Sequence, residues 1–225
     1  MRRDVAKSAA ALVESGMRVG LGTGRTAALF VDELGRRARE EGLKLITVAT
    51  SLRTATQARD LGLPLCELDE VDELDLCVDG ADEVAPSLDL VKGLGGALLR
   101  EKLVASAARR LVIVIDGEKR VQYLGERAPI PVEVVPFGWT HTAQRLGRLG
   151  LAPTLREGRD GPVITDGGHY LLDCRLLLSI DPRLLGAQIK GTLGVVEHGL
   201  FLGLTSQVLV GTPAGVELLL PPPVA

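Results

Sequence analysis

The sequence predicts an α/β protein, with a parallel sheet covered by helices on both faces and a smaller α+β unit after it. Short apolar strands alternate with helices through residues 1–115, which is the pattern of a sheet buried on both faces. Prolines interrupt this pattern near residue 130, and a hairpin turn signal, Asp166-Gly167-Gly168, follows among helices and strands. The 225 residues suffice for one large domain, or for a medium and a small one.

Each element of the first half follows from its apolar pattern. A helix near the N-terminus carries Val5, Ala9 and Val13 on one face. The expected strands and helices then alternate along the chain. The strands are expected at residues 17–21, 43–49, 65–68, 74–78 and 111–115, and the helices at 26–41, 51–61 and 95–110.

The second half is expected to form a separate small unit. Pro129, Pro131 and Pro136 cannot donate to a central ladder, so they indicate a linker or an edge segment. Helices are expected at residues 140–149 and 183–189, and strands at 163–165, 170–174 and 194–198. Residues 203–220 are again strand-like and are expected to rejoin the first domain. The predicted domains are therefore 1–127 plus 203–225, and 128–202.

Composition limits the classes of function. A net charge of −3 provides no basic field for nucleic acid, so the expected partner is a small molecule or a second copy of the chain. Cys66, Cys77 and Cys174 form no CxxC pair, which favours a reduced, cytoplasmic protein with small buried thiols. No apolar run reaches ~18 residues, and no signal-peptide core follows Met1, so neither a membrane span nor export is expected.

A glycine-rich turn, Gly20-Leu21-Gly22-Thr23-Gly24-Arg25-Thr26, joins a strand to a helix. Its backbone N–H groups and the helix N-terminus favour an anion, and the threonine hydroxyls could donate to phosphate oxygens. A dinucleotide site fits poorly, because Arg25 replaces the third glycine and no acid follows the next strand. A plain tight turn with capping threonines is the alternative.

Two segments bring charged groups near this sheet edge. Asp79 and Asp82 flank Gly80-Ala81 at the carboxyl end of an apolar strand, where open α/β sheets bind ligands. The two acids could divide acid and base roles, or could only cap a turn. Lys92 begins the turn Gly93-Leu94-Gly95-Gly96 and could neutralise an oxyanion beside backbone donors, or could be a surface lysine.

Glu101 is the most specific single candidate for a catalytic residue. Lys102, Ser106, Arg109 and Arg110 form a polar stripe on the expected helix, whereas Glu101 shares its face with Val104 and Ala105. An acid on an apolar face loses hydration, which suits it to proton transfer near neutral pH. A structural pair with an arginine is the alternative.

Lys119 and three histidines are further basic candidates, and their positions and spacing separate them. Lys119 follows the strand at 111–115 and therefore reaches the same carboxyl edge as Asp79. The three histidines, His141, His169 and His198, lack the spacing of metal ligands.

Taken together, these segments resemble the A-type ribose-5-phosphate isomerase family over nearly the whole chain. The resemblance rests on motifs whose order and spacing match. They are Gly22-Thr23-Gly24, Asp79-Gly80-Ala81-Asp82-Glu83, Lys92-Gly93, Gly95-Gly96-Ala97-Leu98, Arg100-Glu101-Lys102, Lys119, Pro131-Val132-Glu133-Val134 and Gly211-Thr212-Pro213.

The resemblance implies the interconversion of ribose 5-phosphate and ribulose 5-phosphate without a cofactor or metal. It implies a Rossmann-like domain with a smaller, ferredoxin-like α+β domain, assembled as a homodimer or a dimer of dimers. By resemblance, Glu101 is the proton acceptor. The remaining implied substrate-site residues are Thr23, Gly24, Arg25, Thr26, Asp79, Gly80, Ala81, Asp82, Lys92, Gly93, Leu94, Gly95 and Lys119. Arg25 is a departure, because the family usually has serine there.

The residues suit a proton transfer between C1 and C2 through a cis-enediolate. Glu101 would move the proton, Lys92 and the turn amides would stabilise the oxyanion, and Asp79 or Asp82 would open the ring. The alternatives are an amino-sugar-phosphate deaminase, a non-catalytic sugar-phosphate sensor and a nicotinamide-dependent oxidoreductase. The segment from Lys92 to Lys102 argues against the deaminase. The sensor would need a DNA-binding segment before residue 20, where one short helix fits, and Arg25 in place of a glycine argues against the oxidoreductase.

Overall fold

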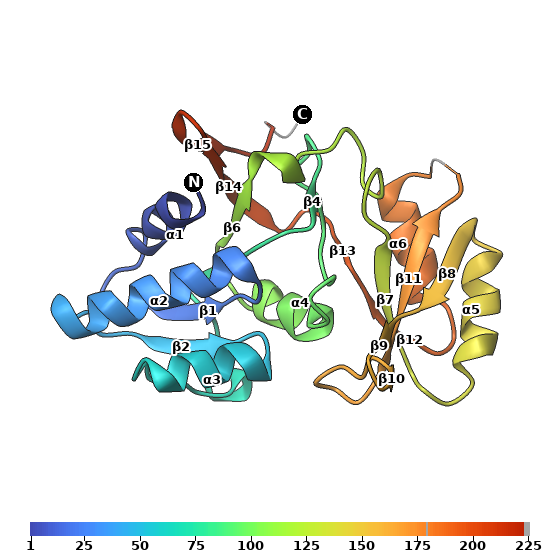
Figure 1. Ribbon diagram of the computed structural model, residues 1–225, viewed down its shortest axis with the longest axis horizontal. Helices are drawn as coiled ribbons and strands as arrows, with labels where there is room; N and C mark the ends of the chain where they lie inside the picture. Colours follow the sequence, from blue (N-terminus) through green and yellow to red (C-terminus); the bar gives the residue numbers. More distant parts are fainter. Residues whose placement is uncertain (179, 223–225) are drawn as a thin grey trace. The chain divides into compact units, whose positions relative to one another are not determined.

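A six-stranded sheet forms the centre of the first structural unit, which comprises Met1–Ala81, Arg100–Lys119 and Gly203–Ala225. The computed structural model describes residues 1–178 and 180–222. The strand order is β15-β14-β6-β3-β1-β2 (Figure 1). The parallel strands are β1 (Arg18–Leu21), β2 (Ile46–Ala49), β3 (Leu76–Asp79), β6 (Leu111–Asp116) and β14 (Thr205–Thr212), and β15 (Gly215–Leu219) is antiparallel. The predicted α/β class is confirmed.

Helices cover both faces of this sheet. They are α1 (Arg2–Ala10), α2 (Arg25–Glu40), α3 (Leu52–Asp60) and α4 (Leu98–Ser106). Val5 of α1, Phe30 of α2 and Ala58 of α3 share one core with Val19 and the strand residues that point the same way. The opposite face packs on α4, where Val104 lies so close to Gly20 that a Cβ there would be 2.7 Å away. Two-sided burial explains why β3 and β6 are apolar up to the aspartate that ends each strand.

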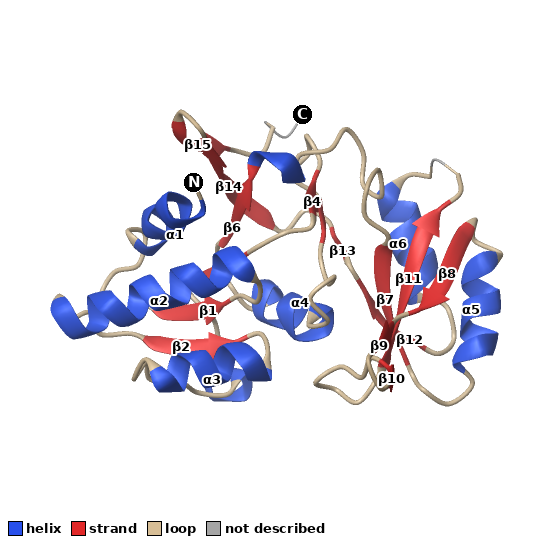
Figure 2. Cartoon of the chain, in the orientation of Figure 1, coloured by secondary structure: helices blue, strands red, loops and turns tan. Residues whose placement is uncertain are grey.

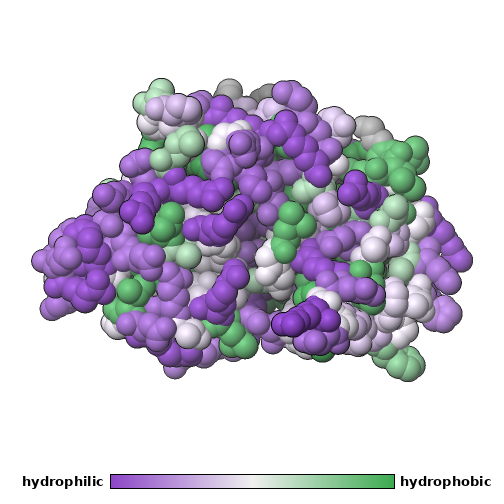
Figure 3. All heavy atoms as spheres, viewed as in Figure 1, coloured by the Kyte–Doolittle hydropathy of each residue, from purple (hydrophilic) through white to green (hydrophobic). Residues whose placement is uncertain are grey.

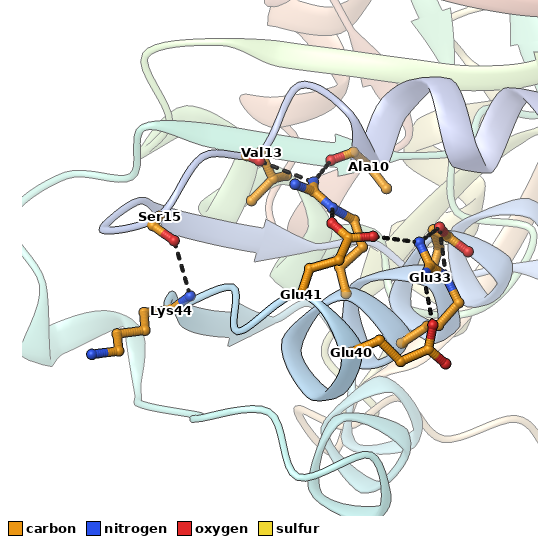
Figure 4. Close-up of polar contacts among 9 residues, drawn as sticks. Ala10, Val13, Ser15, Glu33, Glu40, Glu41 and Lys44 are labelled. Atoms are coloured by element: carbon orange, nitrogen blue, oxygen red, sulfur yellow. Dashed lines mark hydrogen bonds and ion pairs between the residues drawn. The ribbon is translucent and has the colours of Figure 1, made fainter.

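The far end of α2 is tied to the α1–β1 connection (Figure 4). Arg37 donates to the carbonyls of Ala10 and Val13, the latter at 3.0 Å. Arg36 pairs with Glu33, and its hydrogen bond lowers the pKa of that carboxyl. Glu40 and Glu41 complete the network and are exposed, so this end of the unit is strongly hydrophilic (Figure 3). Ion pairs with such exposure contribute little to stability.

The second unit, Asp82–Leu99 with Arg120–Leu202, has a βαββαβ core (Figure 2). In chain order this core is β7 (Ile130–Val134), α5 (Trp139–Gly147), β8 (Leu151–Leu155), β11 (Tyr170–Leu176), α6 (Pro182–Lys190) and β12 (Val195–His198). The strands form an antiparallel sheet in the order β12-β7-β11-β8. Leu146 of α5 and Ile189 of α6 share one core with Val132, so both helices pack on the same face. This is the α+β arrangement expected for the smaller unit.

Short elements complete the two units. A three-stranded sheet in the second unit consists of β4 (Glu83–Val84), β5 (Leu90–Val91) and β13 (Leu200–Phe201). A small hairpin there pairs β9 (Glu157–Gly158) with β10 (Gly161–Pro162). The first unit also has two 3-10 turns. The turn η1 (Leu68–Glu70) comes after Leu65, and the turn η2 (Gly117–Lys119) directly follows β6.

The expectation that Pro131 excludes a central strand is wrong. Pro131 lies in β7, which pairs with β11 on one side and β12 on the other. Its carbonyl accepts from Gly199 N at 2.7 Å, and the Gly199 carbonyl accepts from Lys92 N at 2.8 Å. The acceptor that a residue with an N–H would use at position 131 is therefore satisfied by Lys92, and the missing proline donor leaves no gap.

Several predicted elements differ from the observed ones in their bounds, and three of them differ most. Residues 65–68 form only a bridge, Thr47 to Leu65, and residues 163–165 only a bridge, Ile164 to Tyr170, because neither segment has a full partner strand. The helix expected at 95–110 is shorter, since Gly96 has a φ of +84° before it and Arg109 N bonds to Leu74 O after it. By contacts, residues 82–99 group with the second unit, whereas the predicted domain boundaries, which stay a prediction, place them in the first.

The cysteines are free thiols, as the sequence indicated. Cys77 and Cys174 are buried and Cys66 is half-buried. Burial raises the pKa of the Cys174 thiol to about 12, so it is a neutral core group at physiological pH. Within residues 1–178 and 180–222, no helix is long and apolar enough to span a bilayer.

Candidate functional site

The first unit has a topological switch point between β1 and β3. These strands are parallel neighbours, and the chain proceeds from β1 to β2 on one side and later from β3 to β6 on the other. Their carboxyl ends are joined by a bond from Gly22 N to Val78 O, 2.9 Å long. Open α/β sheets bind ligands in the crevice at such a point. The Gly22–Thr26 turn and Asp79 both emerge there.

Asp79 is locked to the glycine turn. Its side chain is buried, and Oδ1 accepts from Thr23 N at 3.0 Å and from Gly80 N at 2.7 Å. A Cβ on Gly22 would lie 2.3 Å from Asp79 Oδ1 and 2.5 Å from Asp79 Cα, distances that no side chain tolerates. Gly22 is therefore required for Asp79 to pack against the turn, and Asp79 does more than cap its own turn.

A buried cluster of hydroxyl groups supports the turn from below. Thr23 Oγ1 lies 2.7 Å from Thr50 Oγ1, 2.8 Å from Ser51 Oγ and 3.0 Å from Thr54 Oγ1. Thr54 Oγ1 also donates to the Gly22 carbonyl at 3.1 Å. Sequence reasoning missed this cluster. The available signal was Thr50-Ser51 at the end of a strand with Thr54 three residues after Ser51, a helix-capping pattern.

We expect Ser51→Ala to weaken both α3 and the turn. Ser51 is the N-cap of α3, where its Oγ accepts from Thr54 N at 3.1 Å, and losing such a cap costs about 1 kcal/mol. A thermal melt should show a fall in Tm of roughly 2–4 °C, as that cost implies for a chain of this size. Thr56→Ala, an exposed change on the same helix whose hydroxyl bonds only within α3, is the control. An equal loss in both variants would contradict a special role for Ser51.

The N-terminus of α2 follows the turn directly. Gly24, the N-cap, has a φ of +133°, a conformation that favours glycine, and α2 begins at Arg25. Arg25 is exposed and Thr26 is half-buried. The first amides of this 16-residue helix and a nearby guanidinium suit an anion.

Glu101 is buried in α4, with 3% of its surface exposed. Val104 and Ala105 are also buried, whereas Ser106 and Arg109 are exposed. The inward phase predicted for Glu101 is therefore confirmed. Lys119 ends η2, immediately after β6, and is half-buried. Because β6 runs parallel to β3, Asp79 at the end of β3 and Lys119 just after β6 lie at the carboxyl ends of neighbouring strands.

In the second unit, Asp82 holds the turn that follows Lys92. Asp82 Oδ2 accepts from Leu94 N at 2.9 Å, and Asp82 N donates to Val91 O at 2.8 Å. Gly93 has a φ of +106°, and a Cβ there would lie 2.7 Å from the Leu98 side chain. Leu94 and Gly95 are exposed. The acid and the glycine turn are thus one hydrogen-bonded structure.

Lys92 is not a surface lysine. Only 2% of it is exposed, and its ammonium lies 5.4 Å from the centroid of the Phe201 ring. That distance is within range of a cation–π interaction, which stabilises a desolvated cation. Phe201 had no sequence signal, because β13 and β5 pair from segments far apart in the chain.

Glu83 ends the motif Asp79-Gly80-Ala81-Asp82-Glu83, and the structure gives its carboxylate a role. Its carboxylate accepts from Gly125 N at 2.6 Å, Arg127 N at 2.6 Å and Ala128 N at 2.7 Å. It therefore secures the connection leading into β7. The structure brings together Thr23, Asp79 and Gly80 in one unit, and Asp82 with Leu94 in the other.

The fold and these groups define an open α/β protein with a glycine-rich turn and the buried carboxylate of Asp79 at its switch point. The profile of the family described as ribose 5-phosphate isomerase A (phosphoriboisomerase A) matches residues 46–215. "Ribose-5-phosphate isomerase A" of Synechococcus sp. (strain JA-3-3Ab) is 51% identical over 221 residues, covering 97% of this chain and 96% of that protein. The chain belongs to the ribose 5-phosphate isomerase A family.

Solved structures agree with this assignment. Ribose 5-phosphate isomerase A from Methanocaldococcus jannaschii is 42% identical, with a TM-score of 0.94 and coverage of 97% of both chains. A D-ribose-5-phosphate isomerase in complex with phospho-erythronic acid is 36% identical, also with a TM-score of 0.94 and 97% coverage of each chain. The family resemblance seen in the sequence motifs is confirmed.

Proposed function

We propose that this chain is an aldose–ketose isomerase that interconverts D-ribose 5-phosphate and D-ribulose 5-phosphate, a reaction of the non-oxidative pentose phosphate pathway. The observation that carries the proposal is the match to isomerases of this name over 97% of the chain. The residues support it, because buried carboxylates and a glycine turn are what a proton transfer next to a phosphate requires.

The reaction proposed is a proton transfer through a cis-enediolate. Glu101 takes the proton from one carbon and returns it to the other, which one carboxylate can do when both carbons lie within reach. Its burial supports this role, because a desolvated carboxylate is a stronger base toward carbon than a hydrated one. Lys92 and the amides of the turn at Gly93, Leu94 and Gly95 stabilise the oxyanion.

The two aspartates are proposed to handle the oxygen protons. Asp79 or Asp82 opens the furanose ring by acting on the ring hydroxyl and then relays protons between oxygens. Both are held in place by backbone N–H donors, Thr23 N for Asp79 and Leu94 N for Asp82. Such preorganisation keeps their oxygens directed before the substrate arrives.

The phosphate is proposed to bind the first turn of α2. Gly24, Arg25 and Thr26 supply amides, a guanidinium and a hydroxyl, Gly80 and Ala81 line the site, and Lys119 adds a cation. Thr23 contributes through its position, because its hydroxyl is taken up by the buried cluster. The phospho-erythronic acid in the related structure fits this chemistry, since a carboxylate mimics an enediolate at the far end of a phosphate.

Two product assays, run separately, test the proposal against its alternatives. Purified protein is given ribose 5-phosphate with EDTA and no added cofactor, and, separately, an amino-sugar phosphate. Ketose formation in the first reaction without ammonia release in the second is expected. Ammonia release would favour the deaminase, and binding without any product would favour a sensor.

We expect Arg25→Ala to raise KM with little change in kcat. Arg25 lies at the N-terminus of α2 and is exposed, so its contact with phosphate is present in ground and transition states alike. Initial rates over a range of ribose 5-phosphate concentrations measure both constants. Arg53→Ala, an exposed arginine at the start of α3, is the control. A fall confined to kcat in Arg25→Ala would contradict the assignment.

The wider setting is also a proposal. The chain is proposed to act in the cytoplasm on a small sugar phosphate, without nucleic acid, membrane or cofactor. It is proposed to assemble as a homodimer or a dimer of dimers. Sedimentation equilibrium of the purified protein distinguishes these assemblies from a monomer.

A further inference from the structure

Arg156 makes contacts that no sequence motif indicated. It follows β8, and its backbone N donates to Leu171 O of β11 at 2.8 Å. Its guanidinium then spans two partners. Nε donates to Asp173 Oδ2 at 2.9 Å and Nη2 to Asp173 Oδ1, while Nη1 donates to the carbonyls of Gly93 at 3.1 Å and Leu94 at 3.0 Å.

This arrangement holds the guanidinium rigidly. Asp173 lies within β11, paired with Thr154 of β8 on one side and Pro131 of β7 on the other, so its carboxylate is fixed to the middle of the sheet. The pair is bidentate, and only 14% of the Arg156 side chain and 26% of the Asp173 side chain are exposed. Bidentate charged pairs of this kind are strong and directional.

Because a peptide bond is planar, the fixed Arg156 guanidinium also fixes the orientation of the Gly93–Leu94 peptide in the turn after Lys92. In a trans peptide, the C=O and the following N–H point in opposite directions. Arg156 holds the Gly93 carbonyl, and the N–H of the same peptide, that of Leu94, donates to Asp82 Oδ2 at 2.9 Å. One peptide is thus held at both ends, and the direction of the Asp82 carboxylate is coupled to Arg156.

The next peptide is oriented in the same way. Arg156 holds the Leu94 carbonyl, so the N–H of Gly95 points away from the guanidinium. Within the described residues 92–97, the bond from Gly96 N to Gly93 O at 3.0 Å holds the turn from inside, and Arg156 adds two hydrogen bonds to its carbonyls from outside.

We propose that Arg156, fixed by Asp173, is a positioning residue for the isomerisation, which sets the direction of the Gly95 N–H and of the Asp82 carboxylate. The inference rests on the proposed function of these two groups. Neither Arg156 nor Asp173 touches substrate in this account. They act through the turn, so their loss should disturb transition-state contacts more than substrate binding.

The test compares Arg156→Ala, Arg156→Lys and Asp173→Asn with wild type. Arg156→Ala should lower kcat by about 10- to 100-fold, as a misplacement near 1 Å does, with a smaller change in KM. Guanidinium chloride well below denaturing concentration should restore part of kcat, and sodium chloride of equal ionic strength should not. Arg156→Lys should remain impaired, because an ammonium cannot form the planar fork. Arg175→Ala, exposed on β11, is the matched control and should behave as wild type.

Hydrogen exchange of residues 92–97 separates this inference from the proposed function. Exchange there should be faster in Arg156→Ala than in wild type, whether or not the protein turns over ribose 5-phosphate. Inactive wild type with this acceleration would overturn the proposed function alone. Unchanged hydrogen exchange in Arg156→Ala would overturn the inference. A loss of kcat would also overturn it if guanidinium did not restore kcat and if the loss paralleled the fall in Tm. Asp173→Asn, which is nearly isosteric, gives the same readouts if Arg156→Ala fails to fold.

Discussion

Glu101→Gln should lose ~10²-fold or more in kcat, the contribution expected of a general base. The amide keeps the shape of the side chain but cannot accept a proton from carbon. Since Glu101 is 3% exposed within α4, neither a buffer carboxylate nor the side chain of another acid is expected to take its place as the base. Steady-state rates with ribose 5-phosphate and with ribulose 5-phosphate should fall together, because one base serves both directions.

Two controls show whether a loss of activity in Glu101→Gln comes from the missing base and not from misfolding. Glu14→Gln makes the same chemical change at an exposed position outside the proposed site and should leave kcat unchanged. The Tm of Glu101→Gln should stay near that of wild type, because a neutral amide is easier to bury than a carboxylate. Near-normal turnover of folded Glu101→Gln would assign the proton transfer to another residue.

Gly22→Ala should disable the protein with one methyl group. The added Cβ would lie 2.3 Å from Asp79 Oδ1 and 2.4 Å from Asp79 Cγ, so the carboxylate or the turn must move. Overpacking of this kind costs about 1–3 kcal/mol. Because Asp79 Oδ1 also holds Thr23 N, the displacement reaches the turn proposed to bind phosphate, and kcat/KM should fall by ~10²-fold.

The matched control is Gly147→Ala. This glycine ends α5, is exposed, and has nothing within 4 Å of the added Cβ. Alanine is favoured over glycine in a helix by up to about 1 kcal/mol, so Tm should hold or rise. Melting curves and kcat/KM of both variants check the pair. Wild-type activity in Gly22→Ala would show that the contact between Gly22 and Asp79 can relax without consequence.

The parts of the structure that were predictable are those with local signals. β3 and β6 are apolar up to the aspartate that ends each strand, and such runs identify buried parallel strands. The phase of α4 likewise put Glu101 with Val104 and Ala105 on the buried side. These features depend on residues a few positions apart, which a sequence displays directly.

The parts that were not predictable depend on distant partners. Pro131 is tolerated in a central strand because Lys92 N, far away in sequence, occupies the Gly199 carbonyl. Arg156 reads as an ordinary arginine until the fold places it against Gly93, 63 residues earlier. The Thr23 hydroxyl looked available for phosphate, whereas Thr50, Ser51 and Thr54 surround it. Each requires knowledge of which strands meet.

We expect this chain to isomerise ribose 5-phosphate with its own side chains. The most direct measurement follows the aldose and the ketose by NMR, starting from ribose 5-phosphate in one sample and ribulose 5-phosphate in another, with EDTA present and no cofactor. We expect both samples to reach the same mixture with wild type, and Glu101→Gln to approach it ~10²-fold more slowly. Failure of folded wild type to form ketose from ribose 5-phosphate would contradict the account.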